Sequence, residues 1–126
     1  MKEALGLLIL RIGAGGMMIP HGWSKLSKLI STGEFRFADP IGFGPEITLL
    51  FAIFSEFFCA ILVLVGFKTR LATIPLIITM LIAALVVHGS DPWSKQEFPL
   101  LYAVAYLGIG LLGAGKYSLD NRFGNK

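Results

Sequence analysis

Two ionisable residues interrupt long apolar stretches of this sequence, and they are the side chains best suited to chemistry. Arg11 lies within the stretch 4–20, and Glu56 lies within the stretch 47–67. A charge inside a membrane is costly, so it usually marks a function or a partner. If both stretches are helices that meet the same membrane face, Arg11 lies about 10 Å and Glu56 about 16 Å from it. Consecutive helices are usually neighbours, so we expect a buried ion pair between Arg11 and Glu56.

This expected ion pair has two interpretations, which the sequence leaves open. In the first, Arg11 and Glu56 only fix the register of two helices, since a buried pair is weak evidence of stability and can serve specificity alone. In the second, Glu56 is a carboxylate that handles protons, and Arg11 stabilises its charged form. Tyr102 is expected at a similar depth, about 18 Å from the same face. Its hydroxyl group could complete a hydrogen-bonded cluster.

A second polar group is expected near the opposite membrane face. His21, His88 and Glu97 fall at the ends of three apolar stretches. Two imidazoles and a carboxylate at one depth could relay protons or bind a metal. No H-x-x-x-H or comparable spacing supports a metal site, however, and histidines that cap helix ends explain the pattern as well. We therefore assign no metal ligands.

The sequence contains a single cysteine, Cys59. One thiol cannot form an internal disulfide, a C-x-x-C pair or a cysteine metal cluster. A redox function would therefore need an external cofactor or a partner protein.

Four apolar stretches must position these side chains, and each is long enough to cross a bilayer as a helix. They cover residues 4–20, 47–67, 72–88 and 98–114, against a requirement of about 17–25 residues. The chain has 126 residues, of which 55% are hydrophobic and 15% charged, whereas a soluble domain carries about 25% charged residues. So short a chain cannot hide four apolar helices in one soluble core. The sequence predicts an all-α integral membrane four-helix bundle that forms a single domain over residues 1–126.

The longest connection is expected between the first and second helices. Pro20 is predicted to end the first helix, and residues 24–46 then follow before the second helix begins. Within this connection, apolar residues at 26, 29 and 30 have helical spacing. The pattern predicts a short amphipathic helix that lies in the membrane interface.

The distribution of Lys and Arg predicts the orientation of the chain. The N-terminus, the turn at 68–71 and the C-terminus share one side, with six Lys and Arg residues against four on the other. Lys68 and Arg70 lie in the shortest loop, where the positive-inside rule is most reliable. We expect both termini in the cytoplasm. The net charge of +3 is modest and no Lys/Arg run is present, so nucleic acid is not an expected partner.

Small residues inside the apolar stretches are expected to let helices approach closely. Residues 108–113 read Gly-Ile-Gly-Leu-Leu-Gly, which matches the dinucleotide fingerprint G-x-G-x-x-G. That fingerprint needs a preceding strand, whereas this run lies inside a predicted membrane span. Close helix contact is the better explanation, and it applies also to the glycines at 13, 15 and 16.

Taken in order, these residues resemble the signatures of the DoxX family over essentially the whole chain. The resemblance implies a four-helix bundle in a prokaryotic inner membrane. It also implies a link to quinone-dependent redox systems, such as thiosulfate–quinone oxidoreduction and terminal quinol oxidase complexes, or to membrane-associated thiol and oxidative-stress complexes. The residues that carry the resemblance are Arg11, His21-Gly22 and Lys25-Leu26; Glu56, Leu62-Val63-Leu64-Val65-Gly66 and Thr69-Arg70-Leu71-Ala72; Met80, His88, Glu97 and Tyr102; and Gly113-Ala114-Gly115-Lys116-Tyr117-Ser118-Leu119-Asp120.

The resemblance also leads to an expectation for the C-terminal tail. We predict that Ser118-Leu119-Asp120 folds back onto the turn at 68–71, with Asp120 accepting a hydrogen bond from Arg70. The alternative is a solvated tail that follows the last helix.

Three hypotheses for function follow. The leading one is a quinone-linked redox component, in which a quinone enters between helices and a partner protein supplies electrons. The others are a non-enzymatic membrane subunit that anchors or assembles a complex, and a small-solute transporter that would need a homo-oligomer to form its pathway. In the leading hypothesis, the catalytic residues are Glu56, Arg11 and His88, and the residues that contact the cofactor are His21, Tyr102 and Glu97.

Overall fold

The computed structural model describes residues 2–33, 44–87 and 89–124, and these residues form helices with no strand among them. Four helical rods account for most of them. The first rod is α1 (Lys2–Thr32), and the second is the unbroken succession of α2 (Pro45–Ile53), the π-helix η1 (Phe54–Cys59) and α3 (Ala60–Val65). The third rod joins α4 (Thr69–Ile82) to the π-helix η2 (Ala83–Val87), the fourth is α5 (Trp93–Leu112), and the short α6 (Leu119–Arg122) follows.

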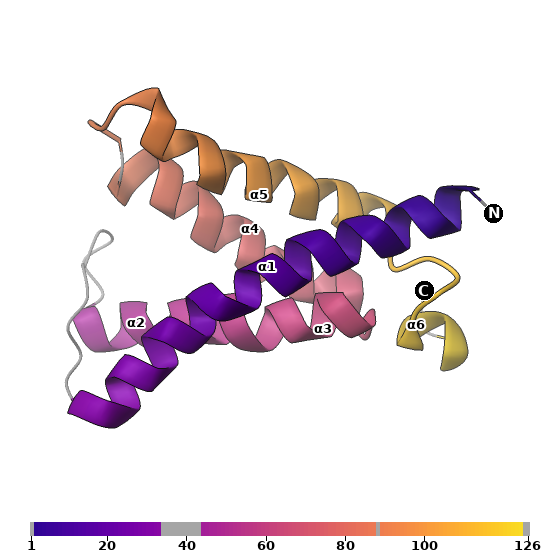
Figure 1. Cartoon of the computed structure of the whole chain (residues 1–126), viewed down its shortest axis with the longest axis horizontal. Helices are drawn as coiled ribbons and strands as arrows, with labels where there is room; N and C mark the ends of the chain where they lie inside the picture. Colours follow the sequence, from indigo (N-terminus) through magenta and orange to yellow (C-terminus); the bar gives the residue numbers. More distant parts are fainter. Residues whose placement is uncertain (1, 34–43, 88, 125–126) are drawn as a thin grey trace.

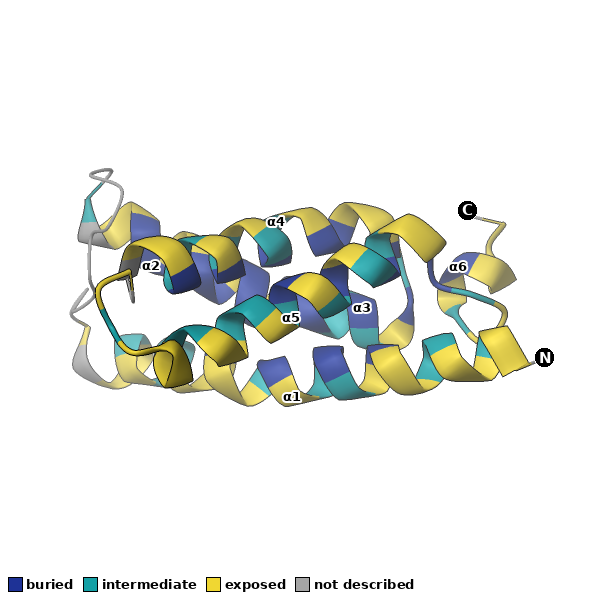
Figure 2. Cartoon of the chain, turned by 90° about the horizontal axis from the view of Figure 1, so that it is seen from above, coloured by how far each residue is buried: buried dark blue, intermediate teal, exposed yellow. Residues whose placement is uncertain are grey.

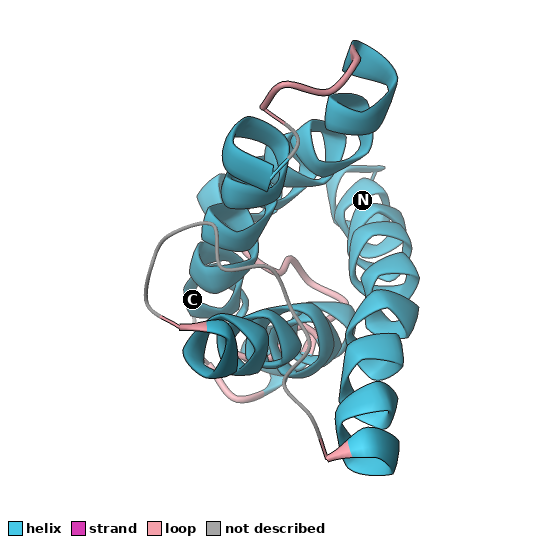
Figure 3. Ribbon diagram, turned by 90° about the vertical axis from the view of Figure 1, so that its left-hand side faces the viewer, coloured by secondary structure: helices cyan, strands magenta, loops and turns pink. Residues whose placement is uncertain are grey.

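The rods pack as a bundle in which each rod runs antiparallel to the one before it (Figure 1). α1 packs against η1, α3 and α5, while α4 packs against α5, η1 and α3. Figure 3 shows the rods nearly end-on. The start of α1, the turn between α3 and α4, and α6 all lie at one end of the bundle (Figures 1 and 2). This confirms that these three parts of the chain share a side.

Within the described residues, three helical segments are long and apolar enough to cross a membrane: Lys2–Ser31, Glu46–Val65 and Thr69–Val86. The fourth predicted span falls on α5, which has 20 residues but carries Lys95, Gln96 and Glu97 near its start. Its crossing of the bilayer stays a prediction.

The distribution of polar and apolar side chains is the one expected of a protein in lipid. Large apolar side chains such as Ile9, Ile74 and Leu107 are exposed, whereas Arg11 and Glu56 are buried. Figure 2 shows that exposed and buried residues alternate along each helix of the bundle. Hydrocarbon offers no hydrogen bonds, so polar groups in a membrane protein turn toward one another. The described part of the chain is therefore an all-α membrane protein.

The first helix does not end at Pro20, which corrects two predictions. Pro20 lies inside α1, and the helix continues for twelve further residues to Thr32. Proline removes one backbone hydrogen bond, but membrane helices tolerate this loss because neighbouring helices and local adjustments satisfy the freed groups. Lys25 and Leu29 therefore belong to α1, and the prediction of a separate interfacial helix is wrong.

Two glycines allow α1 to approach the second rod at backbone distance. A Cβ atom at Gly15 would lie 2.9 Å from Ala60 O, and one at Gly22 would lie 2.5 Å from Phe57 N and 2.6 Å from Glu56 C. The expectation of close contact is thus confirmed for Gly15, and Gly22 is a stronger case that the sequence did not single out. Gly13 has no such neighbour within 4 Å.

Replacement of Gly22 by alanine is expected to destabilise the bundle. The new methyl group would overlap backbone atoms of η1, and overpacking of this kind costs about 1–3 kcal/mol. The matched control is Gly13→Ala, which meets open space and should be neutral or stabilising by up to about 1 kcal/mol, because alanine favours the helix. Thermal unfolding of both variants in mild detergent measures the difference. A Gly22→Ala protein as stable as Gly13→Ala would contradict this view of the α1–η1 contact.

Candidate functional site

The buried carboxylate of Glu56 forms an ion pair with Lys25. Glu56 lies in η1 and is 3% exposed, and its Oε2 is 2.5 Å from Nζ of Lys25 on α1. Lys25 follows Gly22 by three residues, so the close approach at Gly22 brings its side chain to η1. The lysine side chain is 28% exposed. The pair therefore connects the bundle interior with its surface.

Aromatic side chains from α1 and α5 form a chain of ring contacts. The rings of His21 and Tyr102 meet edge to face, with their centroids 6.4 Å apart, and Tyr102 stacks on Tyr106 at 6.0 Å. The buried Tyr106 hydroxyl donates to Ala14 O at 2.7 Å and so ties α5 to α1. Tyr106 also lies close enough to Glu56 for the two to interact electrostatically. We call His21, Lys25, Glu56, Tyr102 and Tyr106 the Glu56 cluster.

The opposite side of η1 is held by hydroxyl groups. Ser55 is fully buried, and its Oγ lies 2.7 Å from Oγ1 of Thr79 on α4. Thr79 in turn lies within hydrogen-bonding distance of Pro75 O, at 2.8 Å. The π-helical segment that carries Glu56 is thus fixed to α1 on one side and to α4 on the other. Single-turn π segments inside α-helices occur frequently at functional sites.

The predicted ion pair between Arg11 and Glu56 is wrong. Arg11 is fully buried, and its guanidinium donates to Val63 O at 3.2 Å, to Leu64 O at 2.9 Å and to Tyr117 O. Val63 follows Glu56 by seven residues, about 10 Å along the rod. The depth estimate failed because α1 is offset along the second rod, so that Gly22 faces Glu56 while Arg11 faces the end of α3.

Arg11 therefore has a different role from the predicted pairing with Glu56. It donates to the last carbonyl groups of α3, where a helix has unpaired acceptors and a partial negative charge. Its bond to Tyr117 O also attaches the C-terminal tail to the bundle. These contacts make Arg11 an anchor for the end of the bundle.

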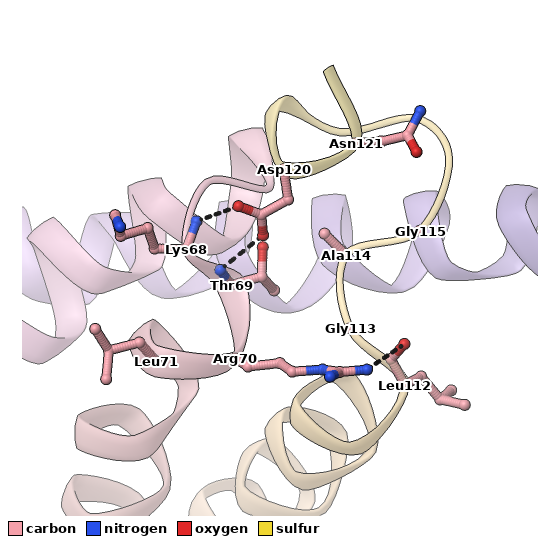
Figure 4. Close-up of a pocket in the computed structure, with 10 residues that line it drawn as sticks. All are labelled: Lys68, Thr69, Arg70, Leu71, Leu112, Gly113, Ala114, Gly115, Asp120 and Asn121. Carbon is pink, nitrogen blue, oxygen red and sulfur yellow. Dashed lines mark hydrogen bonds between the residues drawn. The ribbon is translucent and has the colours of Figure 1, made fainter. Parts of the chain in front are cut away.

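The C-terminal tail folds back onto the α3–α4 turn, as predicted, but through different atoms. Asp120 accepts hydrogen bonds from the backbone N–H groups of Lys68 (2.6 Å) and Thr69 (3.0 Å) (Figure 4). Its own N–H donates to Gly66 O. The predicted bond from Arg70 to Asp120 is wrong. A carboxylate at the first turn of a helix gains two free N–H donors and the favourable end of the dipole. Arg70 instead points to Leu112 O at 3.5 Å.

The remaining candidate residues lie outside the Glu56 cluster or outside the described residues. Glu97 is an exposed residue in the first turns of α5, and His88 falls outside the described residues. Cys59 is a free thiol and packs in the buried core with Met18 and Val63. Among residues 2–33, 44–87 and 89–124, no group of His, Cys, Asp or Glu could hold a metal ion.

Lys25 and Tyr106 are members of the cluster that the sequence analysis missed. A signal for Lys25 was available, because residues 11, 18, 22 and 25 fall on one face of a continuous helix. The assumption that Pro20 ends the helix concealed it. Tyr106 is one turn from Tyr102, at a spacing of four residues, on the same face of α5.

The fold and the cluster define a small all-helical membrane protein with a buried, paired carboxylate. Comparison with protein families is consistent with this class, since the family model described as DoxX matches residues 6–89. The chain belongs to the DoxX family. Comparison with curated proteins gave no match, and comparison with solved structures gave none either.

A double-mutant cycle should show that Lys25 and Glu56 are energetically coupled. Lys25→Met alone leaves the buried carboxylate without its partner, whereas the Lys25→Met/Glu56→Gln protein has no charge to satisfy. The combined loss of stability should fall below the sum of the single losses by about 0.5–3 kcal/mol. Unfolding in detergent provides the measurement. Lys95→Met, at an exposed position on α5, is the control and should add to Glu56→Gln within about 0.5 kcal/mol. Additivity of the Lys25 and Glu56 changes would contradict the coupling.

Proposed function

We propose that this DoxX-family protein is a component of a quinone-linked redox system in a prokaryotic inner membrane. The Glu56 cluster is its site, where a quinone headgroup takes up or releases protons. One observation carries the proposal: a buried carboxylate stands in a π-helical segment of an apolar rod and pairs with a lysine that reaches the surface. The resemblance of the sequence to proteins of quinone-dependent systems supports the same function.

The chemistry of a quinone matches the groups of the cluster. Reduction of a quinone to a quinol consumes two electrons and two protons. Glu56 and Lys25 are joined by a hydrogen bond, and in this proposal the pair passes both protons, one at a time, to the bound quinone. Lys25, which is partly exposed, takes each replacement proton from water. The Tyr102 hydroxyl is a donor for the second carbonyl group. Electron transfer needs a cofactor. In this proposal the cofactor belongs to a partner redox protein, which supplies the electrons.

The proposal requires that a quinone reach the cluster from the bilayer. His21 is exposed and Tyr102 is partly buried, and the two rings lie edge to face between α1 and α5. A quinone that diffuses in the bilayer would meet these rings first and Glu56 behind them. Within this proposal Arg11 is an anchor and not part of the chemistry, while the roles of His88 and Glu97 stay predictions.

The proposed orientation places both termini in the cytoplasm. The start of α1, the turn with Lys68 and Arg70, and α6 share one end of the bundle (Figure 1). Short loops rich in Lys and Arg stay on the cytoplasmic side. Glu56 then lies near the middle of the second rod, which runs from Pro45 to Val65.

Titration with quinones tests the proposed function directly. Protein in mild detergent is titrated with ubiquinone and menaquinone analogues, and the melting temperature is recorded. A ligand that binds only the folded state stabilises it by about 2.7 kcal/mol at one hundred times its Kd. Saturable stabilisation should occur for the wild type and be lost in a folded Glu56→Gln protein. Glu46→Gln, which changes an exposed carboxylate near the start of the same rod, is the matched control and should respond as the wild type does.

Two outcomes would contradict the proposal. Equal stabilisation of wild type and Glu56→Gln would place the quinone elsewhere. No stabilisation by any quinone, together with unfolding of Glu56→Gln, would favour a non-enzymatic subunit that anchors or assembles a membrane complex. The cluster would then serve packing alone.

A further inference from the structure

A pocket of about 490 Å³ lies at the end of the bundle that carries the α3–α4 turn. Figure 4 shows its two walls. One wall is the start of α4, with residues 68–71, and the other is the chain that leaves α5, with residues 112–115, together with Asp120 and Asn121. Ligand pockets commonly have volumes of about 300–1,000 Å³, so this space can hold the headgroup of a lipid.

The pocket is lined by two cationic side chains and one hydrogen-bonded carboxylate. Lys68 and Arg70 are both exposed. Their side chains extend in opposite directions (Figure 4), with Arg70 directed to the wall at Leu112 and Nζ of Lys68 at 5.8 Å from the centre of the Phe67 ring. The bond from Arg70 to Leu112 O is 3.5 Å long, which is a weak contact, so most of the guanidinium donors remain for a ligand. Asp120 also lines the pocket, but its two oxygens already accept from Lys68 N and Thr69 N. The balance of charge in the pocket is positive.

The guanidinium of Arg70 lies beside Gly113, the residue that caps the end of α5. Gly113 has φ 85°, and a Cβ atom there would lie 3.1 Å from Arg70 Nη2. A side chain at position 113 would therefore displace the guanidinium by a few tenths of an ångström. The absence of a side chain there lets Arg70 lie against the backbone of this wall.

The pocket lies at the depth of lipid headgroups. One candidate membrane span ends at Val65 and the next begins at Thr69, so Lys68 and Arg70 stand where the hydrocarbon region meets the polar region. Leu71 and Leu112 line the same pocket and are 66% and 65% exposed. These two side chains would contact acyl chains while the cations contact the headgroup.

We infer that this pocket binds the phosphate headgroup of an anionic phospholipid through Arg70, with Lys68 as a second positive charge at its rim. A guanidinium fork binds phosphate oxygens in a bidentate manner, and an ammonium group adds a point charge. The positive-inside rule accounts for cations in this short loop, but it requires neither a pocket nor apolar side chains beside it. The site is separate from the Glu56 cluster and does not depend on the proposed redox function.

The test is thermal unfolding of the full chain in mild detergent with three added probes. These are phosphatidylglycerol, phosphatidylcholine and inorganic phosphate. Phosphatidylglycerol should raise the melting temperature in a saturable way, while the zwitterionic lipid and the free ion should not. Removal of each cation should weaken the apparent affinity roughly fivefold, so Lys68→Gln/Arg70→Gln should lose about 25-fold. Lys95→Gln, an exposed lysine at the other end of the bundle, is the matched control and should keep the wild-type affinity.

Each other result overturns the inference. An unchanged phosphatidylglycerol response in the double variant, or an equal loss in Lys95→Gln, would show non-specific charge attraction. Equal stabilisation by phosphatidylcholine would show that the headgroup charge is not recognised, and equal stabilisation by inorganic phosphate would assign the pocket to a free anion. The single variant Arg70→Gln, which loses only one weak contact, provides the readout if the double variant does not fold.

Discussion

The structure depends on the backbone contact that α1 makes with the second rod at Gly22 and Gly15. These positions leave no room for a side chain, because the nearest atoms are backbone atoms of residues 56, 57, 60 and 64. The contact sets how far α1 is shifted along its neighbour. That shift decides which charges meet: Lys25 reaches Glu56, and Arg11 reaches the carbonyl groups at the end of α3. The register of two helices thus determines the chemistry of both polar centres.

Lipid explains why so many of the buried polar groups bond to the backbone. Arg11, Asp120 and Tyr106 all have main-chain partners on other segments, namely α3 and the tail, the start of α4, and α1. In hydrocarbon a carbonyl or N–H group at a helix end finds no water. A long side chain from another rod replaces the water and attaches the two segments to each other. The contacts of Arg11 and Asp120 therefore satisfy helix ends, and all three contacts build the tertiary structure.

The sequence predicts the helices well and their register poorly. Apolar stretches and their lengths are local properties, so the helical rods and the common end of the termini could be derived from 47–67, 72–88 and their loops. The return of the tail to the α3–α4 turn was also predicted, although its donors are backbone N–H groups and not Arg70. The prediction of an Arg11–Glu56 pair failed because the depth of each residue was counted from the end of its apolar stretch. Pro20 does not end α1, and the extra turns beyond it bring Lys25 to the carboxylate.

The identity of the partner changes the surroundings of Glu56. A pair with Arg11, which is fully buried, would have enclosed both charges inside the bundle. Lys25 is partly exposed and Glu56 is almost fully buried. The ammonium group, a point charge on a flexible stem, therefore connects the carboxylate with the surface. The offset of α1 along the second rod thus keeps this intramembrane charge pair accessible from outside the bundle, as the proposed proton exchange requires.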